Sequence, residues 1–253
     1  MRRRDGRARL VTAIALCAAG ALVASCASAA RAQHVSAGCD ARRAVALTFD
    51  DGPNPPYTDQ VLRMLRDRGV RATFFVEGAA AAAHPELVAQ ETLAGMGVGS
   101  HSETHSRALA RMREGDFARD TARAQAEIAA AAGFAPALYR APYGHTSTAM
   151  LRVLRRAGYT SVGWDVDSRD WSDATADEVV RNVLAGAHPG AIILMHDGGL
   201  GGGNPDRSTT LAALPRVIDG LRSAGYEMVT VPELTGLRAR QDEPARSATC
   251  LAN

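Results

Sequence analysis

Short apolar runs alternate along the chain with longer segments of helical periodicity, starting at Ala44. The runs have the length of buried strands, and the longer segments repeat apolar positions every three or four residues, as on one face of a helix. Strands are predicted at 45–49, at 73–76, just before 101, and at 138–140, 159–164, 191–195 and 226–231. Helices are predicted at 57–68, 85–93, 117–132, 147–157, 176–184 and 211–224. About seven β/α units predict an α/β barrel of parallel strands, with a doubly wound open sheet as the alternative.

The first 32 residues are predicted to be an export signal that does not belong to the fold. An arginine-rich start is followed by the apolar stretch 10–24 and then by small residues. The stretch is shorter than the roughly 20 residues that a membrane span needs. Two processing routes stay open: lipidation at Cys26, in a context resembling a bacterial lipobox, or cleavage at small-residue sites within 27–32. Either route predicts an exported protein, secreted or held at the cell envelope.

Composition is that of one globular domain. With 46% hydrophobic residues over 253 positions, we expect a domain at 40–237 and a loose polar tail at 238–253. The formal net charge is +2, but residues 1–25 carry five arginines against one aspartate, so the remainder is weakly acidic at −2. A weakly acidic body gives no electrostatic reason to expect a nucleic-acid partner. The chain contains no lysine, which excludes Schiff-base chemistry and lysine-dependent phosphate loops.

Two cysteines, Cys39 and Cys250, lie at opposite ends of the predicted domain. In an oxidising compartment such a pair is predicted to form a disulfide that joins the termini, and the alternative is two unpaired thiols.

Ionisable residues follow five of the predicted strands. They are Asp50-Asp51, His101, Arg140, Asp165 with Asp167, and His196-Asp197. Packing does not explain five such strand ends, and parallel barrels carry their active sites at the C-terminal ends of their strands. The sequence therefore predicts that these groups share one site.

Two imidazoles and a carboxylate within this group are suited to a metal ion. His101 and His105 are four positions apart and share a face if the segment is a helical turn. With one aspartate they form a ligand set for Zn²⁺ or a similar divalent cation that leaves a position open. The neighbouring side chains of Asp50 and Asp51 point in different directions in an extended segment, so one can bind metal while the other acts as a general base.

Five motifs occur in a fixed order along the chain: TFDDGP (48–53), HSETH (101–105), RAPYG (140–144), DSRDW (167–171) and ILMH (193–196). They resemble the five motifs of the polysaccharide deacetylases with a NodB homology domain, carbohydrate esterase family 4. The resemblance covers roughly residues 44–235 and implies a distorted (β/α) barrel.

The resemblance also implies the metal and acid–base groups. Asp51, His101 and His105 would bind the metal, Zn²⁺ first and Co²⁺ as the alternative. Asp50 would be the general base that activates water, and His196 the general acid that protonates the leaving group.

Supporting roles follow in the same way from the motifs. Arg140 would orient the base, Asp50, through a charge pair. Asp170 would tune the acid, His196, and Asp167 of the same motif is the alternative for this role. Tyr143 would offer its backbone N–H to the oxyanion. Trp171 would wall the pocket, and Leu194 would line a slot for the acetyl methyl group.

The expected function is hydrolytic removal of acetyl groups from a carbohydrate polymer or oligomer. The leading prediction is N-deacetylation of a glycan containing N-acetylglucosamine, either chitin oligomers or peptidoglycan. O-deacetylation of acetylxylan is the alternative with the same chemistry, and a non-catalytic glycan-binding lipoprotein is the alternative of another class. Two-metal phosphoester hydrolysis would need a second ligand cluster that the sequence lacks. We expect a monomer, with membrane contact only through a lipid on Cys26. Substrate choice is assigned to loops such as 198–207.

Overall fold

The computed structural model describes residues 34–38, 43–199 and 205–244. Within these ranges the strands form one sheet in the order β1-β6-β5-β4-β3-β2-β8-β7, with β9 paired to β2. All strand pairs are parallel. The strands are β1 (His34–Val35), β2 (Ala44–Asp50), β3 (Thr73–Val76), β4 (Gly97–Ser100), β5 (Leu138–Tyr139), β6 (Thr160–Val162), β7 (Val166–Asp167), β8 (Ile192–His196) and β9 (Glu227–Met228).

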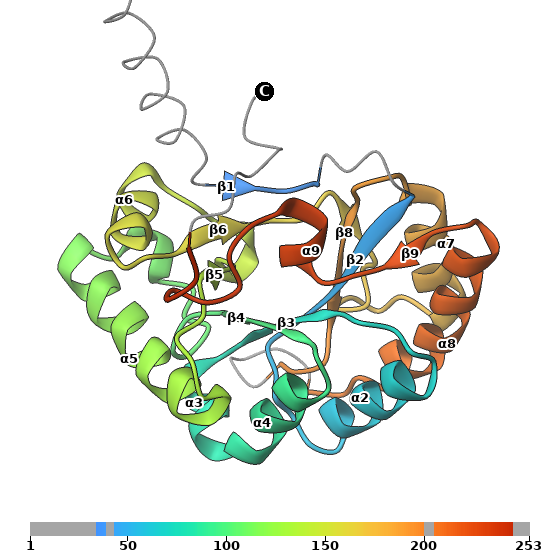
Figure 1. The fold of residues 1–253 in the computed structure, drawn as a ribbon, viewed down its shortest axis with the longest axis horizontal. Coiled ribbons are helices and arrows are strands. Elements are labelled where there is room, and N and C mark those ends of the chain that lie inside the picture. Colours follow the sequence, from blue (N-terminus) through green and yellow to red (C-terminus); the bar gives the residue numbers. More distant parts are fainter. Residues whose placement is uncertain (1–33, 39–42, 200–204, 245–253) are drawn as a thin grey trace, which may run out of the picture.

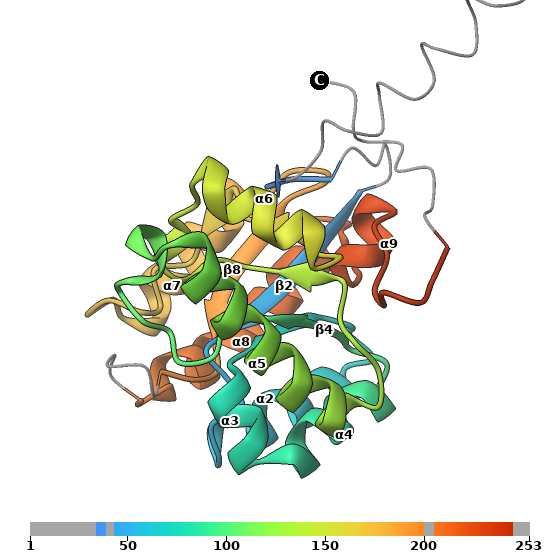
Figure 2. The ribbon, with the colours of Figure 1, turned by 90° about the vertical axis from the view of Figure 1, so that its left-hand side faces the viewer.

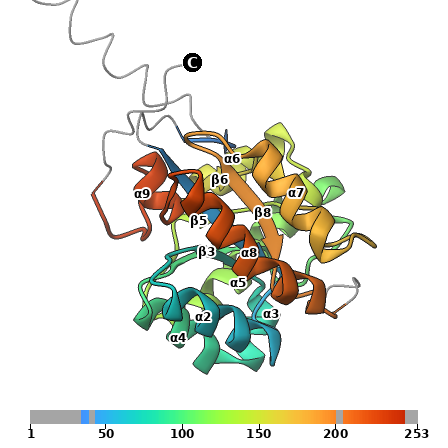
Figure 3. The ribbon, with the colours of Figure 1, turned by 90° about the vertical axis from the view of Figure 1, so that its right-hand side faces the viewer.

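Helices cover the outer side of the curled sheet (Figure 1). They are α2 (Tyr57–Asp67), α3 (Gly78–Ala83), α4 (Pro85–Leu93), α5 (Glu114–Ala132), α6 (Thr148–Arg156), α7 (Ala176–Gly186), α8 (Ser208–Ser223) and α9 (Val231–Thr235), with 3₁₀ turns at Leu109–Arg111 and Pro142–Gly144. Seen from one side, α5 and α6 lie in front of the strands (Figure 2), and from the other side α8 and α7 do so (Figure 3).

The sheet curls because its first strand is connected back to β8. Ala37, just after β1, forms an antiparallel bridge with Ala191, and the Gly38 N–H donates to the Gly190 carbonyl at 2.7 Å. The predicted distorted barrel of parallel strands is confirmed, and the doubly wound open sheet is not found.

Alternation along β2 separates two layers of the molecule. Leu47 and Phe49 belong to the core under the helices, whereas Ala46 belongs to the smaller cluster inside the barrel. Because side chains of a strand alternate between its faces, Thr48 and Asp50 point to the same interior side as Ala46. The strand that supplies much of the core thus also delivers polar groups to the barrel interior.

Two segments differ from the sequence predictions. The last strand is shorter than 226–231, because Thr230 instead caps α9 in a reciprocal arrangement with Glu233. The prediction of a loose tail is wrong for residues 237–244: Leu237 is buried, and the Ala137 N–H donates to the Ala239 carbonyl at 2.9 Å. This part of the tail packs beside the start of β5.

The predicted export signal at 1–32, the lipidation site Cys26 and the cysteines Cys39 and Cys250 lie outside the described residues. Among the residues that the structure does describe, no helix has the length and apolar character needed to cross a membrane.

Candidate active site

A cavity of about 350 Å³ opens at the C-terminal ends of the strands. Eight of the ten predicted site residues line it: Asp50, Asp51, His101, His105, Tyr143, Trp171, Leu194 and His196. The other two, Arg140 and Asp170, are buried behind it, each in contact with a residue that lines it. The structure therefore brings the residues of all five motifs to one place.

Strand register explains how the groups come together. Asp50 at the end of β2 is paired with His196 at the end of β8, so these two residues lie side by side. Ser100 of β4 is paired with Tyr139 of β5. His101 and Arg140 are the next residues after this pair and therefore lie beside each other. The Arg140 N–H donates to the Ser100 carbonyl at 2.9 Å and so fixes this register.

Asp51, His101 and His105 form a compact ligand cluster. Asp51 Oδ1 lies 3.2 Å from His101 Nε2 and 3.3 Å from His105 Nε2. The segment 101–105 is not a helical turn, because Ser102 and His105 have φ angles of 71° and 52°. A hydrogen bond of 3.0 Å from the His105 N–H to Ser102 Oγ holds the tight loop that replaces the turn.

Each imidazole of the cluster has a partner for its other nitrogen. His101 Nδ1 lies 2.9 Å from the Arg140 carbonyl, an acceptor, which requires the proton on Nδ1. His105 Nδ1 lies 3.1 Å from Tyr143 Oη. Such contacts leave both Nε2 atoms facing Asp51, the arrangement typical of metal-binding histidines.

The donor set fits a divalent cation. Asp51 Oδ1 is buried and has no hydrogen-bond donor, although it faces two imidazole nitrogens. Burial, together with the charge of His101, lowers the pKa of His105 to about 4, so this ring is neutral at pH 7 and its lone pair is free. A buried carboxylate and two imidazoles whose Nε2 atoms face it are the ligand types that Zn²⁺ and related ions take.

The backbone adopts rare conformations at the motifs. Among the described residues, the non-glycine positions with positive φ are Asp51, Ser102, His105, Tyr143 and Arg169, and every one lies within a motif. A left-handed conformation costs a non-glycine residue roughly 1–2 kcal/mol. Backbone strain of this kind concentrates at functional sites, where it aims side chains that a regular element would misplace.

Asp50 is held by a fully buried arginine. Arg140 Nη1 donates to Asp50 Oδ1 and to Thr48 Oγ1, both at 2.7 Å, and its Nη2 donates to the Gly163 carbonyl at 2.8 Å. The guanidinium also lies 4.0 Å from the centroid of the Phe75 ring. These contacts satisfy the buried cation and leave Asp50 Oδ2 without a hydrogen bond from the described residues.

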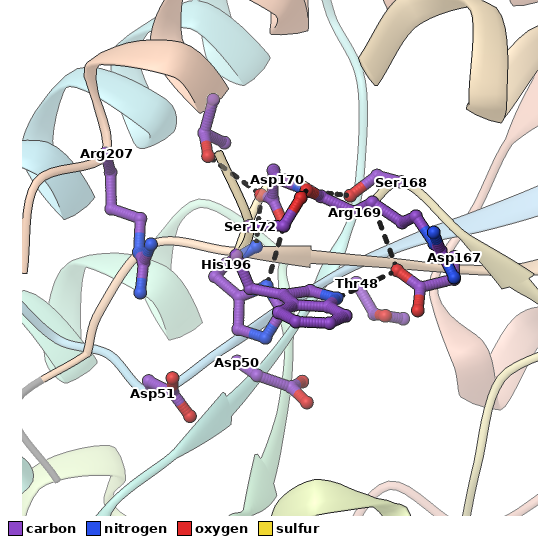
Figure 4. A network of polar contacts seen from close by, with 12 residues as sticks. Thr48, Asp50, Asp51, Asp167, Ser168, Arg169, Asp170, Ser172, His196 and Arg207 are labelled. Carbon is purple, nitrogen blue, oxygen red and sulfur yellow. Dashed lines mark hydrogen bonds and ion pairs between the residues drawn. The ribbon is translucent and has the colours of Figure 1, made fainter. Parts of the chain in front are cut away.

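His196 is paired with Asp170 (Figure 4). Asp170 Oδ1 lies 2.8 Å from His196 Nδ1, while Oδ2 accepts from the His196 N–H at 2.8 Å and from Thr210 Oγ1 at 2.7 Å. Burial lowers the pKa of His196, but the charge and hydrogen bond of Asp170, with smaller contributions from Asp51 and Asp50, outweigh it and raise this pKa to about 9. His196 is therefore protonated at neutral pH.

The two aspartates of the fourth motif have different contacts. Asp167 Oδ1 accepts from Trp171 Nε1 at 3.2 Å and from the Arg169 N–H at 2.8 Å. Only Asp170 contacts His196, so the geometry favours Asp170 over Asp167 as its partner.

Sequence reasoning missed two charged residues around the cavity and assigned no role to a third, the strand-end residue Asp197. Arg107 and Arg207 line it, and neither belongs to a motif. Asp197 is fully buried beneath the loop that follows β2; Thr58 Oγ1 donates to its Oδ2 at 2.5 Å, and burial raises its pKa to about 7. Asp197 had a signal, since it directly follows His196 at a strand end. The positions of Arg107 and Arg207 depend on loop paths that local patterns do not reveal.

The fold and the cavity bring carboxylates, imidazoles and a buried arginine together at the C-terminal strand ends of a parallel barrel. Comparison with known proteins specifies the class. Residues 37–162 match the model of the polysaccharide deacetylase family. The chain is 36% identical over 195 residues to a peptidoglycan-N-acetylglucosamine deacetylase of Bacillus cereus, covering 75% of this chain and 87% of the relative.

Two further comparisons agree. A chitooligosaccharide deacetylase of Sinorhizobium fredii is 41% identical over 199 residues, covering 75% of this chain and 90% of that protein. A solved structure of a peptidoglycan N-acetylglucosamine deacetylase superposes with a TM-score of 0.77 at 30% identity, covering 83% of this chain and 95% of the other. The chain belongs to the polysaccharide deacetylase family, the hydrolases of carbohydrate esterase family 4.

Proposed function

We propose that the protein is a metal-dependent N-deacetylase of glycans that contain N-acetylglucosamine, with Zn²⁺ as its metal. The observation that carries the proposal is the meeting of three units in one cavity: the Asp51–His101–His105 cluster, the Asp50–Arg140 pair and the His196–Asp170 pair. The relatives support the substrate class, since those named above act on N-acetylglucosamine in peptidoglycan or on chitooligosaccharides.

The proposed mechanism divides proton transfer between two residues. Asp50 accepts a proton from the attacking water, while Arg140 holds its carboxylate in place. His196, protonated and anchored by Asp170, donates a proton to the nitrogen that leaves. An amide nitrogen must be protonated to depart, so the base and the acid have to be separate groups.

The remaining residues act on the acetyl group. When bound by Asp51, His101 and His105, a divalent cation supplies Lewis-acid polarisation of the carbonyl and a lowered pKa for water. Tyr143, whose backbone is held at φ 59°, is positioned to offer its N–H to the carbonyl oxygen. Leu194 and Trp171 provide the apolar walls of the cavity for the methyl group.

Acetate release tests this proposal. The purified protein, loaded with Zn²⁺ or Co²⁺, is offered N-acetylglucosamine oligomers, peptidoglycan and acetylxylan, each with and without a chelator. We expect chelator-sensitive release from the N-acetylated glycans. Release from acetylxylan alone would instead support ester hydrolysis, and metal binding without any release would support a glycan-binding protein.

Replacing Asp170 by Asn should shift the pH dependence of the reaction. His196 must be protonated to act as an acid, so the rate of the parent enzyme should fall as the pH rises through about 9. Loss of the carboxylate charge lowers the pKa of His196, and we expect the alkaline limb of kcat/KM to move down by about one to three pH units. Asp167→Asn is the matched control and should leave the limb in place. An unmoved limb in Asp170→Asn would mean that His196 does not set it.

Tyr143→Phe should weaken metal binding. The substitution removes the oxygen that lies 3.1 Å from His105 Nδ1, and with it the partner that holds the ring and its tautomer. Loss of such a partner typically reduces metal affinity about 10–100-fold, which competition with a chromophoric chelator measures. Tyr226→Phe is the control, because its hydroxyl donates to the Ala187 carbonyl at 3.1 Å, far from the cluster. Equal Zn²⁺ affinity in both variants would show that Tyr143 does not support His105.

We also infer export, on the arginine-rich and apolar leader that precedes the fold. Mass spectrometry of the mature protein distinguishes its two routes, since lipidation leaves a modified Cys26 as the first residue and ordinary cleavage leaves an unmodified N-terminus within 27–33. A mature protein that retains residue 1 would contradict export by this leader.

A further inference from the structure

We propose that Arg107 and Arg207 form a carboxylate-binding site at the edge of the catalytic cavity, which selects glycans that carry a negative charge close to the acetylated sugar. This inference rests on the proposed deacetylase function and names the substrate class that the same cavity prefers.

Most charges that line or underlie the cavity have opposite partners within it. Asp50 is paired with Arg140 at 2.7 Å, and His196 with Asp170 at 2.8 Å. Asp51 faces two imidazoles that fit a cation. Arg107 forms no ion pair with a carboxylate of the described residues, and Asp167 lines the cavity as a further carboxylate. A bound divalent cation would leave the cavity with an excess of positive charge, which attracts anions.

Arg207 is only 4% exposed and yet lines the cavity. Its Nε donates to the Gly198 carbonyl and its Nη1 donates weakly to the Asp206 carbonyl at 3.4 Å, so Nη2 has no acceptor among the described residues. Figure 4 shows the Arg207 side chain on the Asp51 side of His196, away from Asp167.

Two nearby carboxylates interact with Arg207. Asp197 has its pKa raised by burial to about 7, so it is only partly ionised at neutral pH, and Thr58 Oγ1 already donates to it. Asp206 accepts from Tyr57 Oη and from the Ser208 N–H, both at 2.9 Å, on the exposed side of the chain, and the charge of Arg207 helps to lower its pKa. Arg207 nevertheless lines the cavity, where its side chain can also meet an anion from outside the protein.

Arg107 lies on the other side of the metal-ligand cluster. Its guanidinium carbon is 4.7 Å from the centroid of the Tyr143 ring, and that ring is 4.4 Å from the ring of His105. Stacking on Tyr143 holds the exposed side chain at the cavity mouth while its donors stay available. Arg107 follows β4 and Arg207 follows β8, with β3 and β2 between them in the sheet, so the two cations flank the cluster.

A carboxylate is the group that matches this arrangement, since a guanidinium binds it through two parallel hydrogen bonds. Two sources exist. One is a carboxylate on the sugar beside the acetylated one, as in a glycan that alternates N-acetylglucosamine with N-acetylmuramic acid. The other is the acetate that the reaction releases. We assign the site to the substrate, because two cations on opposite sides of the cluster suit an extended anionic chain better than one small product.

The test compares three tetrasaccharides: peptide-free alternating N-acetylglucosamine and N-acetylmuramic acid, the same compound with its lactyl carboxylates converted to methylamides, and the chitin tetramer. For the parent enzyme, we expect kcat/KM on the carboxylate form to exceed that on the methylamide by about tenfold or more, as charge-assisted hydrogen bonds allow. High salt should reduce this ratio. Arg107→Gln and Arg207→Gln should each lower it, and the double variant should bring it close to one.

Two further variants and one additive, acetate, distinguish the explanations. Arg207→Lys keeps the charge and should retain part of the ratio, whereas Arg216→Gln, at an exposed pair with Asp177, should not change it. Equal losses on carboxylate and methylamide substrates would overturn the proposal, because they would indicate a structural role. Weaker inhibition by added acetate in the Gln variants, with an unchanged substrate ratio, would also overturn it. Absence of deacetylation on all three compounds would instead refute the proposed function.

Discussion

Asp50→Asn is expected to keep the metal and to lose turnover by about two to four orders of magnitude in kcat, the range that a positioned general base contributes. The amide has the size of the carboxylate, and its oxygen can still accept from Arg140 Nη1. What it lacks is the basicity needed to take a proton from water. The measurement is kcat on an N-acetylglucosamine oligomer together with the zinc content of the same sample.

The control for this variant is Asp67→Asn, on the exposed end of α2, which should have the parent rate. Near-normal turnover in Asp50→Asn would remove Asp50 as the base. Loss of zinc in Asp50→Asn would show instead that Asp50 holds the metal.

Asp51→Asn and His105→Asn are each expected to abolish stoichiometric zinc binding and, with it, activity. Asn tolerates the left-handed backbone that these positions adopt, at φ 72° and 52°, so the change removes a ligand and spares the loop. Among the described residues, three candidate ligands converge in the cluster, so the loss of one leaves two donors for an ion that prefers four-coordinate geometry. Elemental analysis after exhaustive dialysis gives the zinc content per chain.

His188→Asn is the matched control for the ligand variants. This histidine pairs with Asp165 at 2.9 Å on a partly exposed surface and should not affect zinc. One equivalent of zinc retained by either ligand variant would contradict the ligand assignment.

The sequence predicted the position of the site well because the site lies where strands end. A strand such as β8 is recognisable from its apolar run, and the ionisable residue that follows it must lie at the common edge of a parallel sheet. That is why Asp50, His101, Arg140 and His196 were placed together correctly. The motif order then distinguished this arrangement from chance.

The conformation around the metal cluster was not predictable in the same way. His-x-x-x-His suggested a helical turn, but Ser102 and His105 are left-handed, and the loop is held by contacts to Arg140 and Tyr143 some 40 positions away in the sequence. The tail near Leu237 was misjudged for a similar reason, since its hydrogen bonds to the start of β5 span about a hundred residues. Patterns over neighbouring positions carry no information on such partners.

The left-handed residues at the motifs also make the stability of the folded protein depend on the concentration of free metal around it. Several sit on or beside the metal ligands, so the folded chain holds an unfavourable local geometry that a bound cation can offset. A ligand that binds only the folded state adds about 2.7 kcal/mol to the unfolding free energy at a concentration one hundred times its Kd. The melting temperature should therefore rise with free zinc and serve as a direct gauge of occupancy. An enzyme of this design would gain stability wherever zinc is plentiful and unfold more readily where it is scarce.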